Sequence, residues 1–150
     1  MRYIQILNNA AVNETDYEEY AKEHFEHYVA CDIAGFELGN PKWIYDADSD
    51  SIIENPNYEQ MLIDAEKERV GKLKLTKRVF ALALRQFGIT YAQLKEAIAQ
   101  NEQAQLEWDL CVELERKNPL LDDMAVQFDV TPKQLDYIFR KANGEEIDEN

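Results

Sequence analysis

The sequence predicts an α+β protein in which a small N-terminal antiparallel sheet with helices precedes an all-helical C-terminal lobe of two helix-turn-helix-like units. Apolar residues alternate in parts of the first 55 residues and follow a helical repeat after Asn55. The stretches "FGITYAQLKEAI" (Phe87–Ile98) and "FDVTPKQLDYIF" (Phe128–Phe139) share one pattern. A chain of 150 residues with 45% hydrophobic content is long enough for one domain or two small lobes.

Charge divides the chain into the same two parts. Residues 1–70 carry 5 basic and 16 acidic side chains, whereas residues 71–150 carry 11 and 14. The segment Gly71–Arg78 concentrates lysine after a long acidic stretch, so we place an acidic α+β lobe at 1–70 and a helical lobe with the internal repeat at 71–150. A net charge of −14 repels phosphate backbones and anionic membranes. We therefore expect no direct nucleic-acid or membrane partner, and instead another protein with a basic surface.

The N-terminal lobe is expected to begin with a strand and a helix. "RYIQIL" alternates over Arg2–Leu7 and ends at the turn-forming pair Asn8-Asn9. Thr15 followed by Glu18 predicts a capped helix that reaches Cys31. Its apolar stripe would consist of Tyr17, Tyr20, Ala21, His24, Tyr28 and Cys31.

A hairpin and a second helix follow. Trp43–Tyr45 and Ser51–Ile53 predict the two arms of the hairpin, with the acidic "DADSD" as its turn. Asn55 is a good N-cap and Pro56 suits the first helical position, so a helix is expected from there to Val70. The expected buried face of this helix is Tyr58, Met61, Leu62 and Ala65.

After residue 76 the pattern predicts helices alone. The expected ranges are 77–87, 91–100, 102–116, 120–128 and 132–142. Asn118-Pro119 separates the third helix from the fourth, because proline disfavours a helical residue before it. Asn143-Gly144 ends the last helix before an acidic tail.

The repeat encodes two helix starts. In each copy a threonine precedes a glutamine by three positions, Thr90/Gln93 and Thr131/Gln134, which is the spacing of a capping box. A DNA-reading helix needs polar and cationic residues on its outward face. The first copy offers Ala92, Lys95, Glu96 and Ala99, and the second offers Lys133, Asp136, Arg140 and Lys141 just before the acidic tail. This composition favours a packing motif or a protein-docking surface over DNA reading.

Two patterns have partial metal-site spacing, and neither completes a ligand set. His24, His27 and Cys31, with Glu23, have ligand-like spacing, but ligands clustered on one helix do not form a closed zinc set. "DADSDSIIENPN" places aspartates at the first, third and fifth positions of a calcium loop, but Ser51 replaces its glycine and Asn57 its closing glutamate. We expect a solvated turn, and no metal or other cofactor.

Catalysis is not expected either. The chain has no serine nucleophile elbow, no glycine-rich phosphate loop and no paired cysteine motif. Cys31 and Cys111 are expected to be free thiols, as is usual in the cytosol. "MRYIQILNNA" lacks the features of a signal peptide, and no apolar window is long enough for a membrane span. We expect a protein of the cytoplasm that is not an enzyme.

One stretch resembles a known class of proteins. "NPKWIYDADSDSIIENPNYEQMLIDAEKER", Asn40–Arg69, resembles small accessory proteins of tailed bacteriophages, including tail fibre assembly proteins. The shared features are an aromatic strand at Trp43, an acidic turn, an "NP-Y" step at Asn55 to Tyr58 and a charged helix. The helical half also looks like short prophage-encoded proteins. The resemblance implies a phage or prophage origin and supplies no catalytic residues.

The sequence therefore leaves two alternative functions open. The first is a tail or tail-fibre assembly accessory factor that binds another protein. The alternative is an acidic inhibitor of a host defence system, of the anti-CRISPR kind, that mimics nucleic acid in a basic channel. The candidate contact residues are Asp46, Asp48, Asp50 and Glu54 on the hairpin, and Tyr137 and Arg140 on the second repeat.

Overall fold

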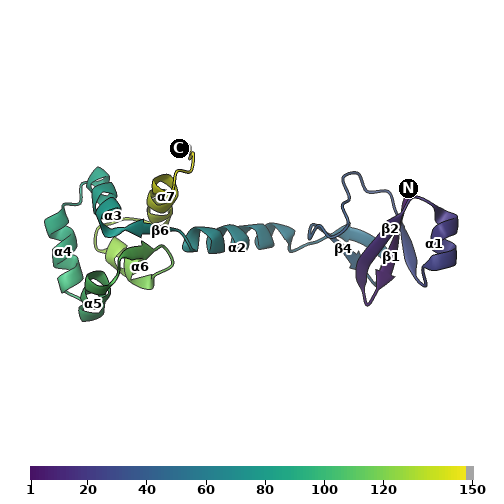
Figure 1. Cartoon of the computed structure of the whole chain (residues 1–150), viewed down its shortest axis with the longest axis horizontal. Coiled ribbons are helices and arrows are strands. Elements are labelled where there is room, and N and C mark those ends of the chain that lie inside the picture. Colours follow the sequence, from purple (N-terminus) through teal and green to yellow (C-terminus); the bar gives the residue numbers. More distant parts are fainter. Residues whose placement is uncertain (148–150) are drawn as a thin grey trace. The chain divides into compact units, whose positions relative to one another are not determined.

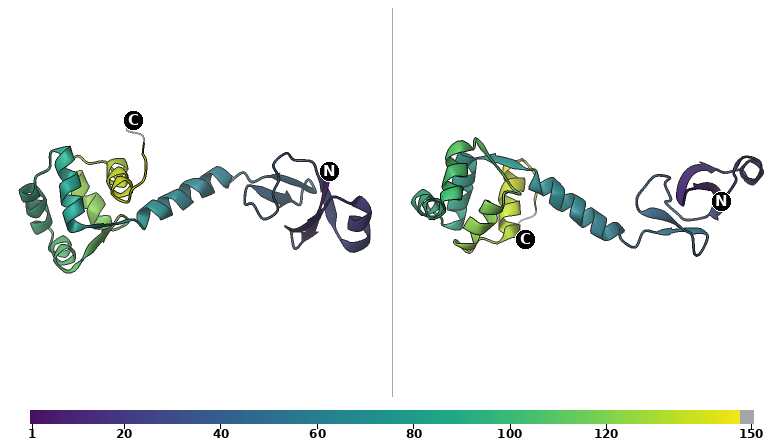
Figure 2. Two further views of the ribbon diagram at one scale, coloured as in Figure 1. Left: turned by 45° about the horizontal axis from the view of Figure 1, so that its top comes forward. Right: turned by 90° about the horizontal axis from the view of Figure 1, so that it is seen from below.

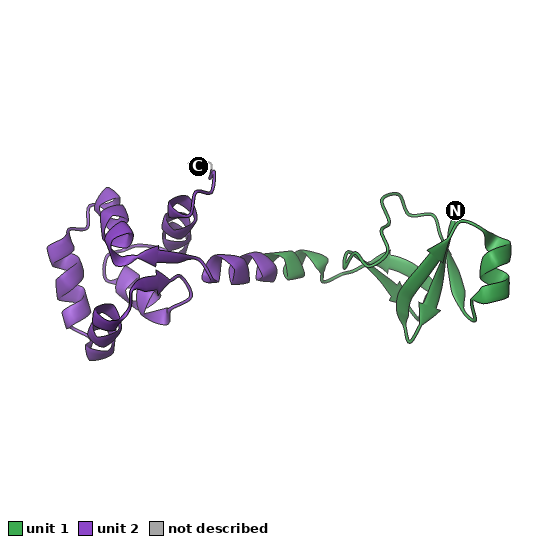
Figure 3. Cartoon of the chain, in the orientation of Figure 1, with its two compact units in different colours: residues 1–63 green, residues 64–150 purple. Residues whose placement is uncertain are grey.

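A computed structural model describes residues 1–147 of the chain, so the last residues of the acidic tail lie outside the described part. The chain divides into two units, Met1–Ile63 and Asp64–Asn150 (Figure 3). The division falls inside helix α2 (Tyr58–Gly71), whereas the sequence places it at the end of that helix. The α+β fold class is confirmed: antiparallel sheets with a helix form the N-terminal unit, and the C-terminal unit is mostly helical (Figure 1).

The N-terminal sheet has β1 (Arg2–Leu7) between β2 (Ala10–Thr15) and β3 (Tyr28–Cys31), and β1 pairs antiparallel with each of them. Asn8 and Asn9 form the two-residue loop between β1 and β2 with φ of 52° and 60°. Tight hairpin turns require such left-handed residues, and asparagine tolerates them well. The predicted turn is confirmed, but β2 is a strand that the sequence pattern did not predict.

The helix expected from Thr15 to Cys31 is wrong in most of its length. Helix α1 covers only Glu18–His24, and its N-cap Tyr17 makes no side-chain capping bond. Tyr28–Cys31 instead pairs with β1, with Val29 opposite Ile4. This pairing buries Val29 and Cys31, so burial against a distant strand overrides the local helical spacing.

The predicted hairpin is confirmed. Strands β4 (Trp43–Asp46) and β5 (Ser51–Glu54) pair in register, with Tyr45 opposite Ile52. Trp43 and Tyr45 pack against the buried cluster of this unit, which consists of Ile4, Ile6, Val29, Cys31, Phe36 and Ile52. The hairpin is therefore held on the core of the N-terminal unit.

Helix α2 is present, but its predicted start at Asn55 and Pro56 and its expected buried face are both wrong. The helix begins at Tyr58, and Asn55 Oδ1 accepts a bond from Asn57 N in a turn before it. Met61 and Leu62 are 44% and 52% exposed, and Val70 is the buried residue of this helix. An apolar stripe buries nothing without an element packed against it.

In the C-terminal unit, helices lie near all five predicted ranges (Figure 2). The elements are α3 (Lys77–Leu84) continued by the 3-10 turn η1 (Arg85–Phe87), α4 (Tyr91–Ala99), α5 (Glu102–Leu110), α6 (Pro119–Val126) and α7 (Pro132–Ala142). Of these, α5 is shorter than expected, since the prediction continued to residue 116.

The expectation of a purely helical C-terminal lobe is wrong, because this unit contains a two-stranded sheet. Strands β6 (Lys74–Thr76) and β7 (Glu113–Glu115) pair antiparallel, with Leu75 opposite Leu114. Both leucines are buried in the core of the unit. The pairing joins residues about forty positions apart, which local periodicity does not reveal.

The repeat forms two helix-turn-helix units that share one core. Thr90 N donates to Gln93 Oε1 at 2.8 Å, Thr131 N donates to Gln134 Oε1 at 2.8 Å, and each threonine hydroxyl accepts the return bond. The two predicted capping boxes are confirmed. Leu94 and Ile98 from the first copy, and Leu135, Ile138 and Phe139 from the second, belong to the same buried cluster.

Candidate functional site

The first candidate surface is the acidic hairpin, which we define by Asp46, Asp48, Asp50 and Glu54. Asp46 ends β4, Glu54 ends β5, and the other two aspartates lie in the connecting turn. The strand pairing thus brings all four carboxylates onto one element. All four are acidic side chains, so the hairpin concentrates negative charge.

Two of these carboxylates build the turn. Asp46 accepts bonds from the hydroxyl and backbone N–H of Ser49, which lower the pKa of Asp46. Asp50, in a left-handed conformation with φ of 47°, accepts the Tyr45 hydroxyl and His27 Nε2, each at 2.9 Å. These bonds lower the pKa of Asp50, and the same contact raises the pKa of Tyr45. The same hydrogen bonds favour the ionised form of both aspartates and fix the turn.

The other two carboxylates, those of Asp48 and Glu54, take no part in the hydrogen bonds just described. Asp48 is exposed at the tip of the turn. Glu54 lies 3.6 Å from Lys42 Nζ, and its side chain is 62% exposed. Because exposed ion pairs contribute little, Glu54 keeps most of its capacity to bind a cationic group of a partner.

The second candidate surface lies on α7, and it places Tyr137 beside an open groove. The groove has a volume of about 240 Å³ and is bounded by α3, η1 and α7. Val79 and Leu82 of α3 form part of its lining. The Tyr137 hydroxyl accepts a bond of 2.6 Å from Lys141 Nζ, so a cationic group lies at the edge of the groove.

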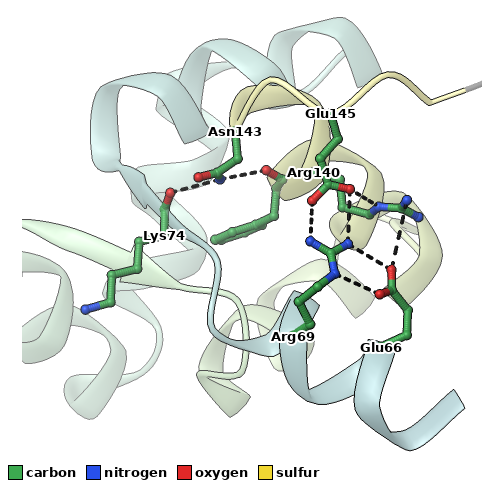
Figure 4. Close-up of polar contacts among 7 residues, drawn as sticks. Glu66, Arg69, Lys74, Arg140, Asn143 and Glu145 are labelled. Atoms are coloured by element: carbon green, nitrogen blue, oxygen red, sulfur yellow. Dashed lines mark hydrogen bonds and ion pairs between the residues drawn. The ribbon is translucent and has the colours of Figure 1, made fainter. Parts of the chain in front are cut away.

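Arg140 takes part in an ion-pair network within the C-terminal unit (Figure 4). Its Nε donates to Glu145 at 2.7 Å, and Arg69 of α2 donates to Glu145 at 2.6 Å and to Glu66 at 2.7 Å. Arg69 first and Arg140 second lower the pKa of Glu145 to about 2. The structure thus gives Arg140 an internal contact between α7 and the segment that follows it.

Two residues on the outward face of the second repeat copy form contacts within the protein. Asp136 accepts a bond of 2.6 Å from Arg116 Nε, and Arg116 is a buried cation. With Arg140 bound to Glu145, two of the four residues weighed for DNA contact hold the fold together. Burying the Arg116 cation requires such a partner, so Asp136 stabilises the fold through this contact.

The residues weighed as zinc ligands have other contacts. His24 Nδ1 donates to the Tyr20 carbonyl at 2.9 Å, and His27 binds Asp50. Within residues 1–147, no group of three or more histidine, cysteine, aspartate or glutamate side chains is arranged to hold a metal ion. Cys31 is a free thiol and so is Cys111, as predicted.

Four of the predicted contact residues lie together on the hairpin, and the other two lie in the C-terminal unit with different surroundings. Sequence reasoning missed Val79 and Leu82, which line the Tyr137 groove and are 39% and 50% exposed. The signal was available, because "TKRVFALALRQF" carries apolar residues on more than one side of its helix.

The chain matches no protein-family model, no curated protein and no solved structure. Over the part of the chain that the structure describes, none of the helices combines the length and the apolar character needed to cross a bilayer.

Proposed function

We propose that this chain is a non-enzymatic protein-binding protein whose acidic hairpin contacts a basic surface of its partner. We further propose that it is a bacteriophage or prophage accessory factor for tail or tail-fibre assembly that acts in the cytoplasm of the bacterial host. The resemblance of residues 40–69 to such accessory proteins supports the assembly role.

The observation that carries the proposal is the preorganised acidic turn. Asp46 and Asp50 are held by hydrogen bonds from Ser49, Tyr45 and His27, so the turn presents its charges in one arrangement. A fixed array loses little conformational entropy when a partner binds. Complementary charge then increases the association rate and selects against acidic partners.

The same charge supports the alternative, an acidic inhibitor of a host defence system that occupies a basic nucleic-acid channel. The excess of 16 acidic over 5 basic residues in the first 70 positions favours it. Both functions use one surface and differ in the partner. The identity of the captured protein therefore separates them.

The test is capture from lysates of bacteria infected with a tailed phage, using the immobilised chain and identifying bound proteins by mass spectrometry. We expect the parent chain to retain a tail or fibre protein, and a hairpin variant to lose it. The hairpin variant changes each aspartate to asparagine and Glu54 to glutamine. Capture should weaken as salt rises, because salt screens charges beyond about 10 Å at 0.1 M.

A matched control changes net charge equally but leaves the hairpin intact. It neutralises four exposed carboxylates elsewhere in the N-terminal unit, namely Asp16, Glu19, Glu23 and Glu26. If both variants lose capture equally, overall charge and not the hairpin attracts the partner. Capture of a defence nuclease would favour the inhibitor, and unchanged capture by the hairpin variant would refute the proposed contact.

Nucleic acid gives an independent check. We expect the parent chain to leave duplex DNA unshifted in a gel at low salt, where weak phosphate contacts are strongest. A tight complex with DNA would contradict the proposal and would make the helix that begins after Thr131 a candidate recognition helix.

A further inference from the structure

A basic segment interrupts this acidic chain around helix α3. From Arg69 to Lys95 the sequence contains seven basic residues and no acidic one, although 30 of the 150 residues are acidic. The segment includes β6, α3 and the start of α4. A run of this length without a carboxylate produces a local positive region on a protein of net charge −14.

Helix α3 and the 3-10 turn η1 that continues it display part of this charge next to apolar surface. Arg78 and Arg85 are exposed and lie seven positions apart, which is two helical turns or about 10 Å along the axis. Leu82 lies between them and is half exposed. The three side chains form a cation–apolar–cation row at one helical spacing.

Two open grooves flank α3 and share Leu82. One is the Tyr137 groove, and the other, of about 470 Å³, is lined by Arg78, Arg85, Tyr91 and Trp108, among others. Among the described residues, no aspartate or glutamate lines either groove. The floor is apolar and aromatic, and the charged groups around it are all cationic.

The cations differ in how they are used. Lys77 Nζ donates to the Trp108 carbonyl at 2.6 Å and lies 5.8 Å from its ring centre, so it is committed to the fold. Arg116 and Arg140 are ion-paired. Within residues 1–147, by contrast, Arg78 and Arg85 make no ion pair and no side-chain hydrogen bond. These two guanidinium groups are therefore available to carboxylates from outside.

We propose that the α3 surface, defined by Arg78, Leu82, Arg85, Tyr91 and Trp108, is a docking site for an acidic amphipathic helix of another protein. An apolar side chain of that helix would enter the groove beside Leu82, and two carboxylates would bind the arginines. Carboxylates two turns apart on a helix match the spacing of Arg78 and Arg85. This site lies in the C-terminal unit, whereas the acidic hairpin lies in the N-terminal unit. It selects an acidic partner, whereas the hairpin selects a basic one.

The chemistry of the surface favours a peptide over nucleic acid. A helix can supply an apolar anchor and two charges together, whereas a duplex presents a charge about every 1.7 Å along its axis. The net charge of −14 opposes such a dense polyanion more strongly than a helix with few charges. Arginine suits this site because its planar fork binds carboxylates in a bidentate manner.

The test uses a synthetic helical peptide labelled with fluorescein, with two glutamates two turns apart and leucine and tryptophan between them. Anisotropy titration should show binding to the full chain. We expect Arg78→Glu with Arg85→Glu to weaken binding at least about tenfold, since two attractive pairs become repulsive. Leu82→Ser should weaken binding as well. Lys133→Glu, a charge reversal at an exposed residue outside both grooves, should bind like the parent chain.

Control ligands and the hairpin variant complete the design. The same peptide with glutamine in place of glutamate should bind at least about tenfold more weakly. The hairpin variant should bind the acidic peptide normally, so failure of the two proposals can be told apart. The docking proposal is overturned if the parent chain does not bind, if the glutamine peptide binds equally, or if the arginine variant is unaffected. It is also overturned if single-stranded DNA binds more tightly and the same variant abolishes that binding.

Discussion

The role of a single residue in this protein depends on its tertiary contacts, and Arg140 shows this best. Its position on the outward side of a predicted helix marks it as a contact residue for a partner. In the structure its guanidinium forms an ion pair with Glu145, and Glu145 forms a second ion pair with Arg69 (Figure 4). The network connects α2, α7 and the segment after α7 within one unit. A helical face therefore identifies an outward residue but not what it contacts.

Acid should weaken this network in a defined range. Hydrogen bonds from Arg69 and Arg140 lower the pKa of Glu145 from 4.5 to about 2. A carboxyl group with a depressed folded-state pKa stabilises the protein above its unfolded pKa and loses that effect as pH falls through the folded value. We expect the contribution of Glu145 to disappear between about pH 4.5 and 2. Thermal melting of the parent chain and Glu145→Gln across this range measures it.

The neighbouring residue supplies the control for this measurement. Glu146 is exposed, and Glu146→Gln removes the same charge. At neutral pH, Glu145→Gln should melt lower than Glu146→Gln, and the gap should close in acid. Equal melting of the two variants at every pH would show that the network does not stabilise the protein.

The sequence predicts a helix or strand of this chain correctly where the residues that define it lie close together in the sequence. The capping boxes of α4 and α7 form as their spacing predicts, because a threonine and the glutamine three positions later satisfy each other's orphan N–H groups. Strand β7 is not local, since it exists by pairing with β6 and burying Leu114 against Leu75. The same reason explains why Tyr28–Cys31 is a strand and not the end of a helix.

The capping threonines should each contribute measurably to stability. We expect Thr90→Ala and Thr131→Ala to reduce the free energy of unfolding by about 1 kcal/mol each. Serine at either position keeps the hydroxyl and should restore most of the loss. Urea denaturation measures the change, and indistinguishable alanine and serine variants would show that the side-chain caps contribute little.

The β6–β7 pair can be tested with two substitutions in neighbouring positions. Leu114→Ala leaves a cavity in the core and should cost about 2–5 kcal/mol. Val112 is 81% exposed, so Val112→Ala should stay within about 0.5 kcal/mol of the parent chain. Chemical denaturation of both variants decides the point. A small effect at Leu114 would mean that this residue is not buried as described.

The residues that the structure describes form two separate hydrophobic cores. One cluster is built around β1, β3 and β5, and the other gathers residues from β6 to α7. No buried residue belongs to both clusters in the part of the chain that the structure describes. Each unit is therefore expected to fold as a cooperative entity.

Two tryptophans make this separation measurable. Trp43 packs against the N-terminal cluster and Trp108 lies in the C-terminal one, so single-tryptophan variants report on each unit. We expect Ile4→Ala to lower the unfolding midpoint reported by Trp43 and to leave that of Trp108 unchanged. A matching shift of both midpoints in urea would mean that the units unfold together.

Local chemistry by itself determined the fold class, the Asn8-Asn9 turn, the acidic hairpin and the capped helix starts at Thr90 and Thr131. Each depends on residues within a few positions of one another, which the sequence displays directly. Tertiary structure decided that Val29 and Leu114 lie in strands, that Met61 and Leu62 are exposed on α2, and which carboxylate Arg140 binds. It also decided that α3 lies between two grooves. These features depend on segments far apart in the chain, and the energy of burying apolar surface and pairing charge between them is not encoded in any local pattern.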